Sequence, residues 1–348
     1  MALLDNTTPG FGLWRRFLAI AGLLFLLSPL APASAALIEW MGAAENEEEA
    51  LASGLEEVLV RLAGLHSPEV DALVPDLLEA DERPWLRSRE QRGEGRFLLV
   101  FDRARLRAAL QEAEVPVWVG SRPALVVWAV LERGERRLLL GSGMDEDSVL
   151  AELREWSARR ELPLLIPLGD LEDRRQVHSA DVIGGAVEAL LEPSRRYDAD
   201  GLLLVHVFKR GEHQRARVWV IYRNHQLQAE ASAATTVMAV REAVTEAMDA
   251  LGARTARVLA EQESALVGFS GVDDMTDLRS LRARLVAMEA VQGTQLNRLL
   301  PGVAVLELRT GLDTAALAEV LAAEGFQAAA APRDVGMDAD LWFLRASR

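Results

Sequence analysis

The chain has 348 residues with a formal net charge of −15, and 50% of its residues are hydrophobic. This length predicts two or three domains, and the apolar content is sufficient for a large core. So acidic a surface excludes the broad basic patches that bind nucleic acid or anionic lipid. The absence of cysteine excludes disulfides, thiol nucleophiles and zinc–thiolate sites, so packing alone must hold the fold together.

The first 35 residues have the pattern of a secretory signal peptide. Arg15-Arg16 precedes an uninterrupted apolar run over residues 17–27, and Ala33-Ser34-Ala35 forms a small-residue cleavage site. The run is shorter than the about 20 apolar residues that span a bilayer. We therefore expect residues 1–35 to be removed and the mature protein to be periplasmic, with membrane contact only through this segment before cleavage. The alternative is an inner-membrane anchor formed by an uncleaved signal.

Residues 36–116 are predicted to form an N-terminal α/β unit. Apolar side chains fall on one face of a helix over residues 45–63, and a second helix begins at Ser67-Pro68, with proline at its first position. The polar stretch 81–95 favours a loop, because it contains one proline and two glycines. A buried strand over 97–101 and a helix over 103–113, capped by Asp102, complete the unit.

Residues 117–262 are predicted to form a middle domain with a mixed sheet. An apolar strand over 124–131, a helix over 147–160 and a buried strand over 164–167 indicate a β-α-β crossover with parallel pairing. The other predicted elements are a strand at 137–140, an acidic loop at 168–181, a helix at 182–197, three strands at 202–208, 215–222 and 226–232, and a helix at 236–261.

Residues 263–348 are predicted to form a ferredoxin-like unit with the element order β-α-β-β-α-β. Asp273 or Asp274 is expected to cap the first helix and Asp313 the second. The predicted strands lie at 266–269, 295–299, 303–309, 327–331 and 341–345. The mature chain as a whole is therefore assigned to a mixed class, α+β or α/β, with three units in succession.

The acidic stretch that follows the strand at 164–167 is the best candidate for a catalytic or ligand site. It contains Asp170, Asp173, Arg174, His178 and Asp181, and open α/β sheets place their clefts at such strand ends. Carboxylates beside a histidine can perform acid–base hydrolysis, although the spacing matches no metal-binding loop. The alternative is a solvated loop whose acidic and arginine side chains pair and whose last aspartate caps a helix.

Arg122 and two tryptophans form a second candidate site. Trp118 and Trp128 flank Arg122-Pro123, and arginine can stack on tryptophan or hold an anion, which suits a small ligand or a cell-wall fragment. The alternative is a tryptophan-filled core beside a tight turn. The five histidines have no metal-site spacing and no glycine-rich nucleotide loop is present, so we expect no metal and no cofactor.

Four segments resemble a family of exported proteobacterial proteins known as domain of unknown function number two thousand and sixty-six. They are Trp118-Val-Gly-Ser-Arg-Pro123 before an apolar strand, the stretch 162–173 running on to Ala180-Asp181-Val182, the early stretch 56–64, and the stretch 196–200. The resemblance implies a location in the envelope and supplies no activity. Ile183 departs from it, because an aromatic residue is expected at this position.

Together, these observations predict a non-enzymatic interaction or assembly factor of the cell envelope with a protein partner. The export signal, the split β-α-β end unit and the missing catalytic motifs favour this function. The alternatives are a periplasmic hydrolase that uses the acidic loop at 170–181, and a binding protein for a small ligand or a cell-wall fragment.

Overall fold

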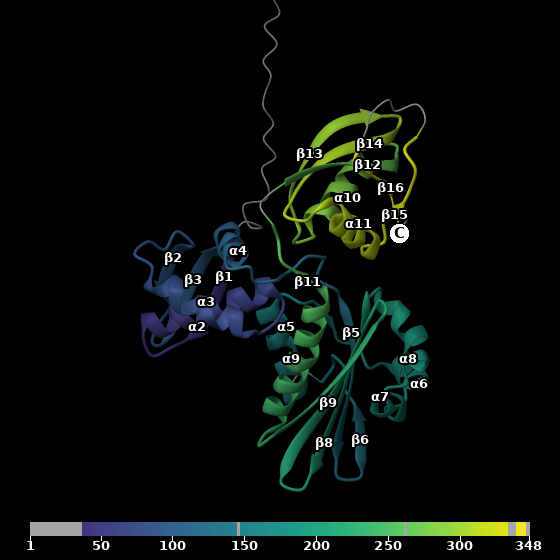
Figure 1. Cartoon of the computed structure of the whole chain (residues 1–348). Coiled ribbons are helices and arrows are strands. Elements are labelled where there is room, and N and C mark those ends of the chain that lie inside the picture. The colour runs from purple at the N-terminus through teal and green to yellow at the C-terminus, as the bar shows by residue number, and fades with distance from the viewer. Residues whose placement is uncertain (1–36, 145–146, 261–262, 333–338, 346–348) are drawn as a thin grey trace, which may run out of the picture.

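The structure is a computed structural model that describes residues 37–144, 147–260, 263–332 and 339–345 (Figure 1). These residues form several sheets with helices packed on them, which confirms the predicted mixed class. The predicted signal peptide and its cleavage site lie outside the described residues. Within the described ranges, no helix combines the length and the apolar character that crossing a bilayer requires.

The N-terminal unit is an antiparallel sheet with the strand order β1–β3–β2, covered by helices. Asn46 caps α2 by accepting the Glu49 N–H, and Ser67 caps α3 by accepting the Val70 N–H. Its elements are β1 (Leu37–Ala43), α2 (Glu47–Ala63), α3 (Pro68–Glu79), β2 (Leu86–Gln91), β3 (Arg96–Asp102) and α4 (Arg103–Glu112).

Two strands of this unit differ from the sequence prediction. The stretch predicted as a loop over 81–95 contains β2, an edge strand that is exposed along nearly its whole length and so has no apolar alternation. β1 has no counterpart among the predicted elements, although Ile38 and Trp40 are buried in strict alternation with exposed neighbours. That period of two is the signal of a half-buried strand.

The middle unit is a six-stranded mixed sheet with helices on both faces. The strand order is β10–β9–β8–β5–β6, and β5 runs parallel to both β7 and β8, which confirms the predicted crossover. Its elements are β4 (Val117–Trp118), β5 (Leu125–Arg133), β6 (Arg136–Leu139), α5 (Ser148–Arg160), β7 (Leu164–Leu165), α6 (Leu171–Gln176), α7 (Ser179–Gly184), α8 (Val187–Ser194), a 3-10 turn (Arg195–Tyr197), β8 (Gly201–Arg210), β9 (His213–Tyr222), β10 (His225–Ala233), α9 (Thr236–Thr255) and β11 (Ala256–Arg257).

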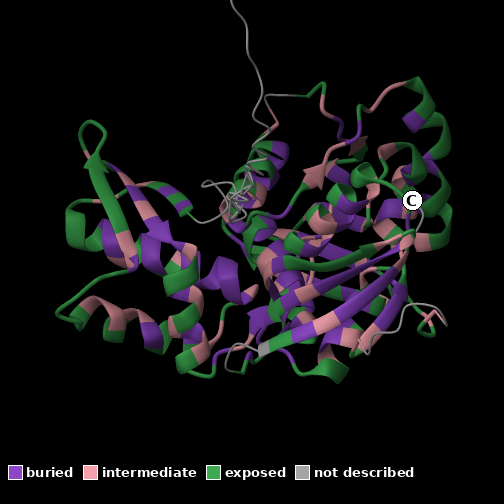
Figure 2. Cartoon of the chain, turned by 90° about the horizontal axis from the view of Figure 1, so that it is seen from above, coloured by how far each residue is buried: buried purple, intermediate pink, exposed green. Residues whose placement is uncertain are grey.

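Alternate residues of β5 point into two separate cores on opposite faces of this sheet. Val127 and Ala129 join the core under α5 and α9, whereas Val126 and Trp128 join the core under α7 and α8. Figure 1 shows the two pairs of helices on either side of the strands, and Figure 2 shows the buried residues concentrated along the strands and inner helix faces.

The segment between β7 and β8 is more helical than predicted. Residues 168–181 are not a loop, because Asp170 caps α6 and α7 begins at Ser179. The single helix predicted over 182–197 is divided at Gly185, which adopts φ 64°. A Cβ at Gly185 would lie 2.9 Å from Trp219, so the close approach to β9 requires glycine here.

The C-terminal unit is a five-stranded sheet with the order β13–β14–β12–β16–β15. The antiparallel β12, β13 and β14 follow the predicted ferredoxin-like order, but β16 lies parallel to β12 with β15 outside it. β16 contains the apolar pair Trp342 and Phe343, and both side chains are buried. This strand therefore takes the inner position in the sheet, between β12 and β15. Its elements are β12 (Glu263–Val272), α10 (Met275–Val286), β13 (Val291–Leu300), β14 (Gly302–Thr310), α11 (Thr314–Ala323), β15 (Gln327–Ala328) and β16 (Leu341–Leu344).

Several contacts join the three units. β4 pairs with β11, so the strand that enters the middle unit lies beside the strand that leaves it. Glu289 of the C-terminal unit binds both Arg103 and Arg107 of α4, and Arg103 also binds Glu161 of the middle unit at 2.9 Å. The predicted limits of the three domains, at residues 116 and 262, stay predictions.

Candidate functional site

Asp170 and Asp173 lie in a closed hydrogen-bonded network. Asp173 is 1% exposed and accepts the Tyr197 hydroxyl at 2.7 Å and the Gly169 N–H at 2.8 Å. Arg196 binds Asp170 at 3.1 Å and Asp173 at 3.2 Å. The N–H of Asp173 and the Arg196 guanidinium hold the pKa of Asp170 below its usual value. These interactions satisfy both carboxylates from within the chain.

Tyr197 connects this network to Trp128. The two rings meet edge to face with centroids 6.0 Å apart, and the Trp128 indole N–H donates to Ser194 Oγ at 2.8 Å. Trp128 is fully buried. The structure therefore links Asp170 and Asp173, through Arg196 and Tyr197, to the buried Trp128.

His178, Arg174 and Asp181 lie apart from that network. The His178 side chain is 69% exposed and its Nδ1 is 3.6 Å from Asp181 Oδ2, while Arg174 points outward from α6. In the described ranges, no hydrogen bond or ion pair links His178 to Asp170 or Asp173. The three groups that a hydrolase of this segment would need are thus not assembled around one point.

Arg122 lies over Trp118 and not beside Trp128. Its guanidinium is 4.8 Å from the centre of the Trp118 ring and donates to the backbone oxygen of Arg61. Burial lowers the pKa of Arg122 to about 10, so the group stays charged at neutral pH. Trp118 and Trp128 belong to the cores on opposite faces of the middle sheet.

A different place in the fold has the form of a ligand site. A cleft of about 220 Å³ lies between the middle and C-terminal units. The C-terminal end of α9 and one side of α11 border it. Its lining residues come from four distant segments, namely Trp118, Val119, Gly120, Ser121, Tyr222, Arg223, Asn224, His225, Arg254, Thr255, Arg257, Glu319, Val320, Ala323 and Glu324.

One acidic side chain on the floor of this cleft accepts hydrogen bonds from two residues of the chain. Glu324 accepts the Ser121 N–H at 3.0 Å, the Ser121 hydroxyl at 2.5 Å and the Arg223 guanidinium at 2.9 Å. A Cβ at Gly120 would lie 2.6 Å from Glu324 Oε1, so glycine permits this approach. Burial raises the pKa of the adjacent Tyr222 to about 12. The floor of the cleft is therefore held by hydrogen bonds, and the Tyr222 phenol beside it is neutral at neutral pH.

The rim of the cleft, in contrast, carries arginines without a carboxylate partner. Arg254 and Arg257 are exposed, and in the part of the chain that the structure describes neither lies within ion-pair distance of an acidic group. Arg257 donates to the backbone oxygens of Arg254 and Ala256 at 3.1 and 2.9 Å, which orients its guanidinium. Such a pair of guanidiniums is suited to hold a carboxylate.

Sequence reasoning did not find this cleft. Arg223 precedes Arg254 and Arg257 by about thirty residues along the chain, and the three match no motif. The single available signal was the Arg-x-x-Arg spacing of Arg254 and Arg257 at the end of a predicted helix, where arginine is also favoured by the helix dipole alone.

Residues 38–119 match the family described as Domain of unknown function (DUF8605). The match covers the N-terminal unit and β4, and gives no activity. It corrects the resemblance drawn from the sequence, because the family found is not number two thousand and sixty-six. Most of the residues behind that resemblance lie beyond residue 119 and are turn, cap and strand residues that many folds share. No curated protein and no solved structure matches the chain.

Proposed function

We propose that this protein is an exported, non-enzymatic interaction factor of the cell envelope, and that its cleft holds a carboxylate-bearing segment of a partner protein. The observation that supports this most is the open pair Arg254 and Arg257 on a chain of net charge −15. The negative charge of the chain as a whole repels an acidic partner, and this pair of arginines attracts it, which would direct the contact to the cleft.

The size of the cleft favours a protein segment over a larger free ligand. Its volume of about 220 Å³ is smaller than the about 300–1,000 Å³ of sites that enclose a drug-sized molecule. One acidic side chain or a chain terminus fits such a space. The rest of the partner would then contact the surface around the cleft.

The edge strand β13 provides that surface. It starts beside the cleft, because the Ala290 N–H donates to the Val119 oxygen at 2.9 Å. In the described ranges no strand pairs with its outer edge, and Leu296 and Leu299 are 39% and 43% exposed. An extended partner segment can add to such an edge through main-chain hydrogen bonds.

Site-specific photocrosslinking in cells tests this function. A crosslinking amino acid at Thr255 is expected to capture one envelope protein, at a position next to an aspartate, a glutamate or a C-terminus. The double variant Arg254→Glu/Arg257→Glu should abolish capture, whereas Arg174→Glu/Arg175→Glu, with the same change of charge on exposed helix α6, should not. Capture that survives the first variant, or that both variants abolish equally, would contradict the proposal. N-terminal sequencing of the purified protein tests export, with Ala36 as the expected first residue.

A further inference from the structure

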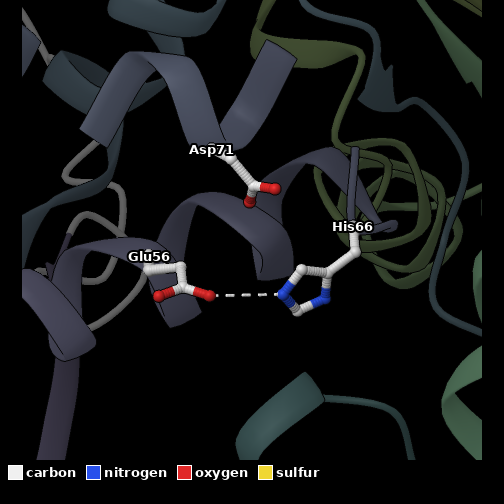
Figure 3. Close-up of side chains that lie close together, drawn as sticks. All are labelled: Glu56, His66 and Asp71. Atoms are coloured by element: carbon white, nitrogen blue, oxygen red, sulfur yellow. Dashed lines mark hydrogen bonds and ion pairs between the residues drawn. The ribbon is translucent and has the colours of Figure 1, made fainter. Parts of the chain in front are cut away.

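The turn between α2 and α3 brings together three side chains that can ligate a metal ion (Figure 3). Glu56 lies on α2, Asp71 in the first turn of α3, and His66 in the short connection between them. One oxygen or ring nitrogen from each residue lies within 4.8 Å of the other two. We propose that Glu56, His66 and Asp71 bind a divalent transition-metal ion, with Zn²⁺ as the best match.

The distances agree with the ligand set of such an ion. Zinc–nitrogen and zinc–oxygen bonds of about 2.1 Å in a tetrahedron place neighbouring ligand atoms about 3.4 Å apart. His66 Nε2 lies 3.4 Å from Glu56 Oε1. The remaining separations, up to 4.8 Å, close by side-chain rotation, since His66 and Glu56 are 47% and 50% exposed.

The charge around the site also favours a cation. Three arginines line the same open pocket as Glu56 and His66, and each is paired with another carboxylate: Arg159 and Arg241 bind Glu152, and Arg160 binds Asp249. Among the described residues, His66 is the ion-pair partner of Glu56, and the Asp71 carboxylate has none. Two carboxylates facing one imidazole therefore have no compensating Lys or Arg, and a divalent ion would supply that charge.

The scaffold holds the connection in place before any ion binds. Gly64 ends α2 at φ 84° with its N–H on Val60 O, and a Cβ there would lie 2.7 Å from Trp118. Ser67 caps α3 at once by accepting the Val70 N–H. His66 thus stands between two fixed helix ends, which limits the entropy that ligation costs. Three protein ligands leave a fourth position for water or for a partner's side chain.

Zinc titration of the purified protein tests this site. Isothermal calorimetry with ZnCl₂ in a chelator-free buffer, with metal analysis after dialysis, is expected to show one equivalent bound. His66→Ala and Asp71→Asn should each weaken binding at least tenfold. His178→Ala is the matched control, because it removes another exposed histidine beside a carboxylate, and it should bind zinc as the unmodified chain does.

Cobalt substitution adds a readout of geometry. Co²⁺ bound by one nitrogen and two oxygen ligands should give a visible absorption band that is absent in His66→Ala. Far-ultraviolet circular dichroism of each variant checks the fold, which these exposed side chains should leave unchanged. Absence of bound zinc, binding that is unchanged in His66→Ala and Asp71→Asn, or an equal loss in His178→Ala would overturn the proposal. None of these outcomes bears on the cleft at Arg254 and Arg257.

Discussion

Replacement of Glu289 by glutamine should loosen the contact between the N-terminal and C-terminal units. The Glu289 carboxylate accepts from Arg103 at 2.5 Å and from Arg107, and the three side chains are only 15%, 17% and 13% exposed. Glutamine keeps the shape and one acceptor oxygen but removes the negative charge. Two largely buried guanidiniums then lose their shared counterion.

The expected loss in the free energy of unfolding is about 2 kcal/mol. Removing one partner of a fully buried pair costs about 3–5 kcal/mol, and an exposed pair contributes about 0–1 kcal/mol. The Glu289 cluster lies between these limits, since each side chain retains some contact with water. With an unfolding entropy of about 2.1 cal/mol/K per residue, about 2 kcal/mol corresponds to a decrease in Tm of about 3 °C for a chain of 348 residues.

Differential scanning calorimetry of Glu289→Gln measures this change, with Glu192→Gln as the matched control. Glu192 also binds an arginine, Arg195 at 2.9 Å, but both side chains are about three-quarters exposed, so its loss should not shift Tm measurably. The reasoning is refuted if the two variants shift Tm equally, or if Glu289→Gln leaves Tm unchanged at low ionic strength.

Three further predictions concern packing and titration. The two tyrosines, Tyr197 and Tyr222, have pKa values raised to about 12 by burial, so ultraviolet titration should show little tyrosinate near pH of about 10, and stability should be full below that pH and fall as the pH rises through about 12. Trp128→Ala should cost about 3–5 kcal/mol in urea denaturation, because the side chain is fully buried; a cost below about 1 kcal/mol would argue against a packed core. The pKa of Asp102 lies below its usual value, because burial raises it but the Arg105 N–H and Arg87 together lower it by more. The stabilisation that this carboxylate gives to the fold is therefore present above pH of about 4 and is lost as the pH falls through the folded pKa. Asp102→Asn should flatten the acid side of the curve of stability against pH, and an unchanged curve would contradict this prediction.

Elements with local signals were predictable from the sequence. α2 has its apolar face, its cap and its terminal Gly64 within a single stretch, and Asp102 precedes α4 as expected. β2 was missed because its neighbours in the sheet, and not its own polar residues, make it a strand. The place of β16 was missed because pairing between residues 267–270 and 341–344 is decided by packing over a long distance in sequence.

The candidate sites were less predictable than the fold, because no local pattern encodes them. The acidic segment looked like a site from its composition, yet Arg196 and Tyr197, about two dozen residues later, satisfy its carboxylates. The cleft depends on how two units meet, and Arg254 gains its role only through segments far away in sequence. The Glu56–His66–Asp71 cluster needs the angle of two helices, which residue spacing alone does not supply.

The pairing of β4 with β11 brings the two ends of the middle unit side by side. Trp118 lies opposite Ala256, so the polypeptide enters and leaves the middle unit at points about 5 Å apart. Core residues before and after this junction, such as Leu110 and Phe269, belong to one cluster, whereas the middle sheet has its own cores. Topologically, the six-stranded sheet is an insertion into a body built from the two flanking segments. A short linker across the junction would rejoin that body, and another domain with adjacent termini could occupy the same point of insertion.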